Sequence, residues 1–307
     1  MQTMTPAANT KPPVADHQKV LALRRGNSLA AVARQTGLPL GTVKAICSRS
    51  GAFRDNQALR SLCSLPPVQQ SSSSALAQIT LPPQVEVTGD PELDALLWLR
   101  EVIKTGNPAF IANALEAVKR IKTPIDVLER KYTQHLVAQN PGSLMAAFQS
   151  IGFADLEALA RSTNEKLALR HEGLARFGNV EGLFAETPAE RFCIDALKGV
   201  HRKRDFGDYD ASTVDARFNS RADLLPQTLD DCLFELRYWD DLYRLREADS
   251  CGDHEPEVNA REDFVLRSLA RIRPRTKAEA VSVFRYLAES EFMDRKETES
   301  ILLNLIG

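Results

Sequence analysis

Long apolar runs are missing from this 307-residue sequence. No stretch approaches the roughly 18 uninterrupted apolar residues of a membrane-spanning helix, so we expect no membrane contact. Cysteine is scarce, and the cysteines are widely spaced without a C-x-x-C pair: Cys47, Cys63, Cys193, Cys232 and Cys251. Their odd number and their spacing indicate neither a disulfide framework nor a zinc ribbon. The sequence therefore predicts free thiols in a reducing, cytoplasmic location.

Signatures of catalysis are lacking as well. The sequence has no G-x-x-x-x-G-K-[ST] loop for ATP, no H-E-x-x-H helix, and no serine or cysteine in a recognisable nucleophile motif. The acidic pairs at 230–231 and 240–241 fall in an expected helix, where neighbouring side chains point about 100° apart and cannot converge on one ion. The segment 251–254 offers one Cys and one His, whereas structural zinc usually takes about four ligands. We expect no enzymatic activity, no cofactor and no metal.

Charge is distributed unevenly along the chain. Hydrophobic residues make up 43% and charged residues 26%, which is typical of globular domains and sufficient for two of them. Residues 1–64 contain nine Lys or Arg and two Asp, for a net +7, whereas residues 65–307 contain 30 basic and 39 acidic residues, for −9. A basic head on an acidic body predicts that one end of the chain approaches a polyanion.

Two short helices joined by a tight turn are predicted at residues 28–49, SLAAVARQTGLPLGTVKAICSR, after a helix from Asp16 to Gly26. Ser28 is the expected N-cap of the first of the two, and Gly37 can take the positive φ of the turn. Small and apolar residues at the spacing of a helical seam surround the turn: Val32, Ala33, Leu38, Val43 and Ile46. Thr36 stands where an apolar residue is commoner.

This segment resembles the helix-turn-helix DNA-binding domains of bacterial and phage regulators, including the GTVK type (here 41–44) of sigma-factor-like and small-terminase-like proteins. The resemblance covers residues 16–54. It implies that a third helix, from about residue 40 to residue 49, enters the major groove of double-stranded DNA. The residues implied to face the DNA are Leu40, Gly41, Thr42, Lys44, Ala45, Ser48 and Arg49.

The chemistry of these side chains suits a duplex. Thr42 can bond a phosphate or a base edge, and Lys44 and Arg49 can reach guanine acceptors or phosphates. Leu40 and Ala45 can touch a thymine methyl group. The alternative is a helical hairpin of an unrelated bundle, in which both cations are merely solvated. A further group of bases within 271–277 crosses an expected helix break, where it complements helix ends or contacts a phosphate.

The rest of the chain predicts an all-α fold, with the small helix-turn-helix domain linked to a larger multi-helix domain. We expect a disordered arm rather than a signal peptide at 1–15, the DNA-binding domain at 16–64, and a linker at 65–90. Two Pro-Pro pairs bracket a four-serine run in that linker. Residues 91–307 are expected to form an all-helical domain for oligomerisation or partner binding.

Capping boxes support the helix starts in this larger domain. The candidates are Thr123–Asp126, Thr187–Glu190, Thr228–Asp231, Thr276–Glu279 and Asp294–Glu297. Helices are expected at 91–104, 108–121, 124–138, 142–151, 154–177, 188–204, 229–247, 256–271, 277–290 and 294–306. A loop is expected at 205–227.

Three functions fit this pattern. The first is a DNA-binding transcriptional regulator of a bacterium, phage or mobile element. The second is a non-catalytic site-recognition subunit, such as a DNA-packaging adaptor resembling phage small terminases, with 91–121 as its ring-forming hairpin. The third, an enzyme acting on DNA, lacks a nucleophile or carboxylate triad. Because one short helix reads few base pairs, we expect a homo-oligomer. Its candidate surfaces are Trp98, the helix pair 91–121 and the apolar C-terminal helix. The acidic domain is a candidate site for a protein partner.

Overall fold

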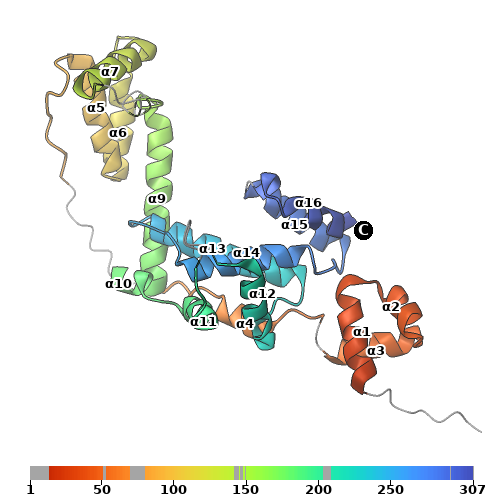
Figure 1. Cartoon of the computed structure of the whole chain (residues 1–307). Coiled ribbons are helices and arrows are strands. Elements are labelled where there is room, and N and C mark those ends of the chain that lie inside the picture. Colours follow the sequence, from red (N-terminus) through yellow and green to blue (C-terminus); the bar gives the residue numbers. More distant parts are fainter. Residues whose placement is uncertain are drawn as a thin grey trace, which may run out of the picture. The chain divides into compact units, whose positions relative to one another are not determined.

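A computed structural model of the chain describes residues 14–50, 53–69, 80–141, 145, 148, 150–202, 209–290 and 292–306 (Figure 1). Regular structure in these residues is helical, without a strand, which confirms the all-α fold class. None of the described helices is long and apolar enough to cross a membrane. The chain divides into two compact units. The first comprises Met1–Leu65, Ala185–Tyr243 and Asp253–Gly307, and the second comprises Pro66–Phe184 and Arg244–Gly252.

The helices of each unit follow in chain order. In the first unit they are α1 (Val14–Gly26), α2 (Leu29–Thr36), α3 (Leu40–Ser50), α4 (Gln57–Leu62), α11 (Pro188–Leu197), α12 (Ala211–Asn219), α13 (Leu229–Glu247), α14 (Pro256–Leu269), α15 (Lys277–Glu289) and α16 (Thr298–Ile306). In the second unit they are α5 (Pro91–Lys104), α6 (Pro108–Val118), α7 (Ile125–Gln139), α9 (Leu156–Phe177) and α10 (Val180–Phe184). Helix α13 begins in the first unit, and its last turn belongs to the second.

Each group of helices encloses its own apolar cluster. The main cluster of the first unit lies among α11 to α16 and includes Phe218 and Phe264. In the second unit, α5, α6, α7 and α9 pack around buried side chains such as Leu96 and Ile103. Helices α1, α2 and α3 share a smaller cluster of their own. Since a fully buried aliphatic or aromatic side chain contributes about 1.5–3 kcal/mol, these clusters are what hold the helices together.

A buried ion pair crosses the main cluster. Arg261 of α14 donates to both carboxylate oxygens of Glu235 on α13, with Nε–Oε1 and Nη2–Oε2 distances of 2.6 and 2.8 Å. The two side chains are 0% and 1% exposed. The guanidinium also donates to the carbonyl oxygen of Leu224 and lies within 5.4 Å of the centroids of three phenylalanine rings. Because an unpaired buried charge is strongly destabilising, this pair fixes α13 against α14.

The structure corrects several predicted boundaries. The segment expected as a loop at 205–227 contains α12, whose N-cap Asp210 accepts a hydrogen bond from the Thr213 N–H. The helix expected at 188–204 ends at Leu197, and Gly199 follows with a φ of +78° that ends the helical path. The helix expected at 142–151 falls largely outside the described residues.

The capping predictions divide in the same way. Thr187 and Glu190 form both bonds of a capping box, and Thr228 and Thr276 each accept a bond from an N–H three residues on. Two other boxes are wrong. Helix α7 begins at 125 with Pro124 as its N-cap, which has no side-chain acceptor. The Glu92 carboxylate accepts the hydrogen bonds of the 122 and 123 N–H groups. Helix α16 begins at 298, after the predicted cap at 294.

The two units do not coincide with the predicted domains. The sequence pattern placed 91–307 in one domain, whereas residues 91–184 belong to a different unit from 185–243 and 253–307. Residues 1–65 are grouped with these later helices. The predicted linker has no helix at 65–69 or 80–90, and its serine run lies outside the described residues, as does most of the predicted N-terminal arm.

Candidate nucleic-acid interface

The turn between α2 and α3 is built from the residues that the sequence pattern singled out. Ser28 caps α2, and its hydroxyl oxygen accepts a hydrogen bond from the Ala31 N–H at 3.2 Å. Helix α2 ends at Thr36, and Gly37 follows in the left-handed region with a φ of +69°. Helix α3 then begins at Leu40. A left-handed residue at this point reverses the chain direction and lets α3 pack back onto α2.

Helices α1, α2 and α3 pack pairwise around a small apolar core. Its buried members are Val20, Val32, Val43, Ile46 and Cys47. The predicted seam residues Ala33 and Leu38 pack against this core while partly exposed. The predicted seam is therefore confirmed. Helix α1 contributes Val20, and it begins at Val14 rather than at the expected cap Asp16.

The polar residue in this seam satisfies its own hydrogen bond. The hydroxyl of Thr36 donates to the carbonyl oxygen of Val32, one turn earlier in α2, at 2.7 Å. A buried hydroxyl without a partner would be costly, whereas a bond to the preceding turn removes that cost. Threonine can therefore occupy a position where an apolar residue is commoner.

The predicted contact residues lie away from the core side of α3. Leu40, Gly41, Lys44, Ser48 and Arg49 are exposed, and Thr42 and Ala45 are half-buried. The Leu40 side chain is 42% exposed. The buried residues 43, 46 and 47 occupy the opposite side of the helix. The seven predicted residues thus share one continuous outer face of α3, which we call the α3 face.

The two cations of the α3 face have no carboxylate partner among the described residues. Lys44 and Arg49 form neither an ion pair nor a side-chain hydrogen bond in that part of the chain. Arg60, by contrast, is held by two carboxylates, with its Nε 2.9 Å from Oδ1 of Asp231 and its Nη2 3.2 Å from Oδ2 of Asp55. Some of the positive charge of residues 1–64 is therefore neutralised within the protein. Arg60, one of the nine basic residues of that segment, is paired with carboxylates and is not available to bind a polyanion.

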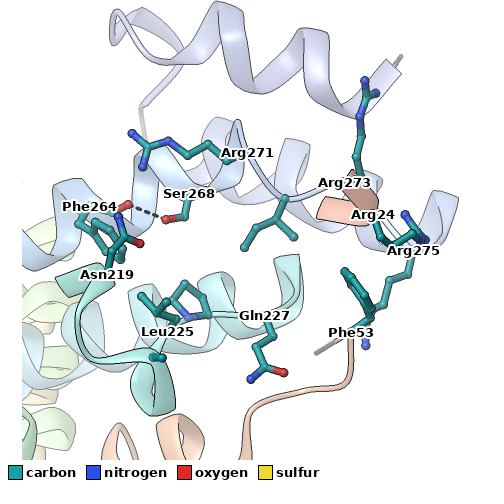
Figure 2. A pocket seen from close by; sticks show the side chains of 13 residues that line it. Arg24, Phe53, Asn219, Leu225, Gln227, Phe264, Ser268, Arg271, Arg273 and Arg275 are labelled. Carbon is teal, nitrogen blue, oxygen red and sulfur yellow. Dashed lines mark hydrogen bonds between the residues drawn. The ribbon is translucent and has the colours of Figure 1, made fainter. Parts of the chain in front are cut away.

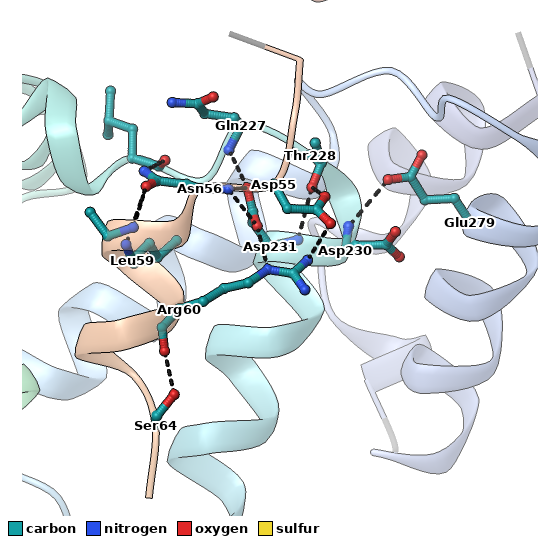
Figure 3. A network of polar contacts seen from close by, with 12 residues as sticks. Asp55, Asn56, Leu59, Arg60, Ser64, Gln227, Thr228, Asp230, Asp231 and Glu279 are labelled. Atoms are coloured by element: carbon teal, nitrogen blue, oxygen red, sulfur yellow. Dashed lines mark hydrogen bonds and ion pairs between the residues drawn. The ribbon is translucent and has the colours of Figure 1, made fainter. Parts of the chain in front are cut away.

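A polar network around Asp231 attaches the segment before α4 to the start of α13 (Figure 3). The Asp231 side chain is 0% exposed and accepts hydrogen bonds from the backbone N–H of Asn56 and of Gln227. The Asn56 side chain donates to the carbonyl oxygens of Asp223 and Leu225 at 2.8 and 2.9 Å. The sequence identified Asp231 as part of a helix start, but it missed this long-range role.

Asp230 and Asp240, one from each acidic pair, also make structural contacts. Asp230 pairs with Arg275 at 2.6 Å, and Asp240 accepts a hydrogen bond from the Tyr286 hydroxyl at 3.1 Å. Burial and the Asp240 carboxylate raise the pKa of Tyr286. Among the described residues, no group of three or more His, Cys, Asp or Glu side chains is arranged to hold a metal ion.

The buried thiols are poor nucleophiles. Cys63, Cys193 and Cys232 are 0–2% exposed, and burial raises the pKa of each thiol well above its ordinary value. A catalytic cysteine needs the opposite shift, because the thiolate is the reactive form. Burial also raises the pKa of Cys47, which lies on the core side of α3. These cysteines act as small apolar core residues.

Comparison with known proteins leaves these geometric observations to stand alone. No protein-family model, no curated protein and no solved structure matches the chain.

Proposed function

We propose that this protein binds double-stranded DNA, with α3 entering the major groove. The observation that carries the proposal is the α3 face: its cations are exposed and have no carboxylate partner among the described residues, while the other side of the helix is held in a core. An α-helix fits the major groove, and exposed cations on it gain phosphate or guanine contacts without breaking an existing ion pair. A rigid helix presenting a solvated basic face is what duplex recognition requires.

Each residue of the α3 face has a role in this proposal. Lys44 and Arg49 bind guanine acceptors or phosphate oxygens, and Thr42 hydrogen-bonds a phosphate or a base edge. Leu40 and Ala45 lie against thymine methyl groups. Gly41 lets the DNA approach the helix backbone closely, and Ser48 extends the hydrogen-bonding edge. The acidic remainder of the chain is repelled by DNA and thereby orients the encounter.

A transcriptional regulator remains our first interpretation of this binding, ahead of a packaging adaptor. An adaptor built on 91–121 would need a surface on α5 and α6 for its ring. The indole N–H of Trp98, a candidate for that surface, donates to the Pro82 carbonyl oxygen at 2.9 Å, and buried residues of both helices pack within the second unit. These contacts use the hairpin internally, and no observation favours the ring.

We further propose that the protein reads DNA as a homo-oligomer. One recognition helix contacts few base pairs, and a second copy doubles the site. The C-terminal helix α16 buries Ile301 in the main cluster and leaves Leu303 and Ile306 59% and 84% exposed. It is therefore docked on its own chain, with apolar side chains remaining at the surface. Sedimentation velocity at micromolar concentration tests this proposal, and a strict monomer, free and on DNA, contradicts it.

Selection of bound sequences from random duplexes tests DNA recognition directly. The full-length wild-type chain should enrich a defined site, and Lys44→Ala should bind that site about 1–3 kcal/mol more weakly if Lys44 reads a base. Arg285→Ala is the matched control, because Arg285 is exposed on α15 and its substitution removes one positive charge, as Lys44→Ala does. Enrichment of no duplex by the folded wild-type chain in dilute buffer would refute the proposal.

A further inference from the structure

A cavity of about 290 Å³ in the first unit has a strongly basic lining (Figure 2). Four arginines contribute to it, and no acidic residue does: Arg24, Arg271, Arg273 and Arg275. Arg24 comes from α1, and the other three come from the segment between α14 and α15. Alternate residues of that segment therefore point basic groups toward one space.

The carboxylates that pair with Arg271 and Arg275 stand outside the lining. Arg271 bonds Asp215 while its side chain remains 51% exposed, and Asp215 is shared with Arg267. Arg275 bonds Asp55, Asp230 and Glu279 while remaining 32% exposed. A guanidinium has five N–H donors, so these pairs leave donors for a further acceptor. Because the partner carboxylates do not line the cavity, its wall presents cations to whatever enters.

The remaining wall is largely apolar. Phe53, Leu225 and Ile272 line the cavity, and the amides of Asn219 and Gln227 stand among them. The guanidinium carbon of Arg24 lies 5.4 Å from the centroid of the Phe53 ring, and Figure 2 shows both side chains among those that line the cavity. An inorganic anion would leave this apolar surface uncovered, whereas a neutral apolar molecule would leave the unused N–H donors of Arg271 and Arg275 without an acceptor. The volume lies near the lower end of the roughly 300–1,000 Å³ that small-molecule sites span, which suits a ligand of about one ring.

We propose that this cavity binds a small organic anion, with a phosphate or carboxylate group joined to a single aromatic or apolar ring. The arginines bind the anionic group through charge-assisted hydrogen bonds, which planar guanidinium groups make with phosphates and carboxylates. The ring packs against the apolar wall. This site is independent of the α3 face and does not depend on DNA binding.

The test uses the full chain with arginine-selective ¹⁵N labelling and follows the Nε–H signals by NMR. Phenyl phosphate, benzoate, neutral benzyl alcohol and inorganic phosphate are titrated separately at constant ionic strength. We expect saturable shifts with phenyl phosphate or benzoate, and binding at least about tenfold weaker for benzyl alcohol and for inorganic phosphate, because each lacks one half of the recognition. Equal responses to the charged ring compounds and to either control would overturn the proposal.

Variants locate the binding. Arg271→Gln should weaken phenyl phosphate binding about tenfold and leave the fold intact, because Asp215 keeps its bond to Arg267. Arg273→Gln provides a second variant at the cavity wall, and circular dichroism checks that both are folded. Arg285→Gln, outside the cavity, should bind as the wild type does. Wild-type affinity in folded Arg271→Gln and Arg273→Gln would show that the ligand lies elsewhere and would refute the assignment.

Discussion

The backbone N–H of Asn56 donates to the carboxylate of Asp231, at 3.1 Å from Oδ1 and 2.9 Å from Oδ2, across 175 residues of sequence. The same carboxylate holds Arg60 on α4. This contact ties the segment that follows α3 to α13. The segment that follows the basic N-terminal helices is therefore held by this buried acid as well as by the bonds of the Asn56 side chain to the Asp223 and Leu225 carbonyl oxygens.

Removing that acid should loosen the attachment. Asp231→Ala leaves the backbone N–H groups of Asn56 and Gln227 and the Nε–H of Arg60 without their acceptor. The expected cost is about 2–4 kcal/mol in unfolding free energy. Asp230→Ala, next in sequence and 45% exposed, should cost about 1 kcal/mol or less. Urea unfolding measures both, and hydrogen exchange at residues 56–59 should accelerate in the first variant. Equal stabilities for the two variants would contradict the role of Asp231.

The turn glycine and its neighbour make a matched pair. Gly37 has a φ of +69° and open space where a Cβ would lie, so Gly37→Ala should cost about 1–2 kcal/mol through backbone strain alone. Gly41 also faces open space but is helical, so Gly41→Ala should stabilise α3 by up to about 1 kcal/mol. Hydrogen exchange of the α2 and α3 amides should show opposite changes, and changes of the same sign would be inconsistent with this geometry.

Local signals predicted the α2–α3 turn well, for a physical reason. The cap at Ser28, the glycine at 37 and the apolar spacing of 43 and 46 all act within a few residues of one another. The direction of the α3 face follows from the same spacing, because a helix that buries 43, 46 and 47 must turn 41, 44 and 48 outward.

Long-range choices were beyond such reasoning. Nothing near residue 231 in the sequence indicates a partner at residue 56, because many acids stand beside helix starts. The division into units likewise depends on contacts such as the bond from Arg246 to the Leu183 carbonyl oxygen, which joins the end of α13 to the second unit. Periodicity gives the buried side of each helix but not the helix that covers it. The sequence shows the arginines of residues 271–275 as a cluster, but it does not show that they line one cavity together with Arg24.

A half-buried acid in α14, Glu262, predicts a loss of stability toward alkaline pH. Burial, with the nearby carboxylates of Asp240 and Asp263, raises the pKa of Glu262 to about 8 from its ordinary value of 4.5. Between these two values, the folded chain holds a proton that the unfolded chain releases. The unfolding free energy should therefore fall as pH rises through this window, by at most about 1.4 kcal/mol per pH unit from this group.

The neutral variant Glu262→Gln isolates this contribution. It should be more stable than the wild type at pH 8, and the difference should shrink toward pH 5 because the wild-type side chain is then protonated in the folded state. Urea unfolding at several pH values measures the difference, with the exposed Glu289→Gln on α15 as the control. A pH-independent difference between Glu262→Gln and the wild type would show that the acid does not titrate in this range.

Salt dependence should distinguish the DNA-facing cations from the structural ones. Each phosphate contact made by a Lys or Arg contributes about 0.9 to the slope of log affinity against log salt concentration, because a condensed counterion is released. If Lys44 and Arg49 contact phosphates, Lys44→Gln and Arg49→Gln should each reduce that slope by about 0.9 on the selected duplex. Fluorescence anisotropy at four or more salt concentrations gives the slopes.

Arg285→Gln, at an exposed position on α15, changes the net charge by the same amount and is the control. It should leave the slope unchanged, since long-range attraction alters encounter rates rather than counterion release. A lower slope in all three variants would point to a diffuse charge effect, whereas a lower slope confined to the α3 variants would require both cations to lie against the duplex.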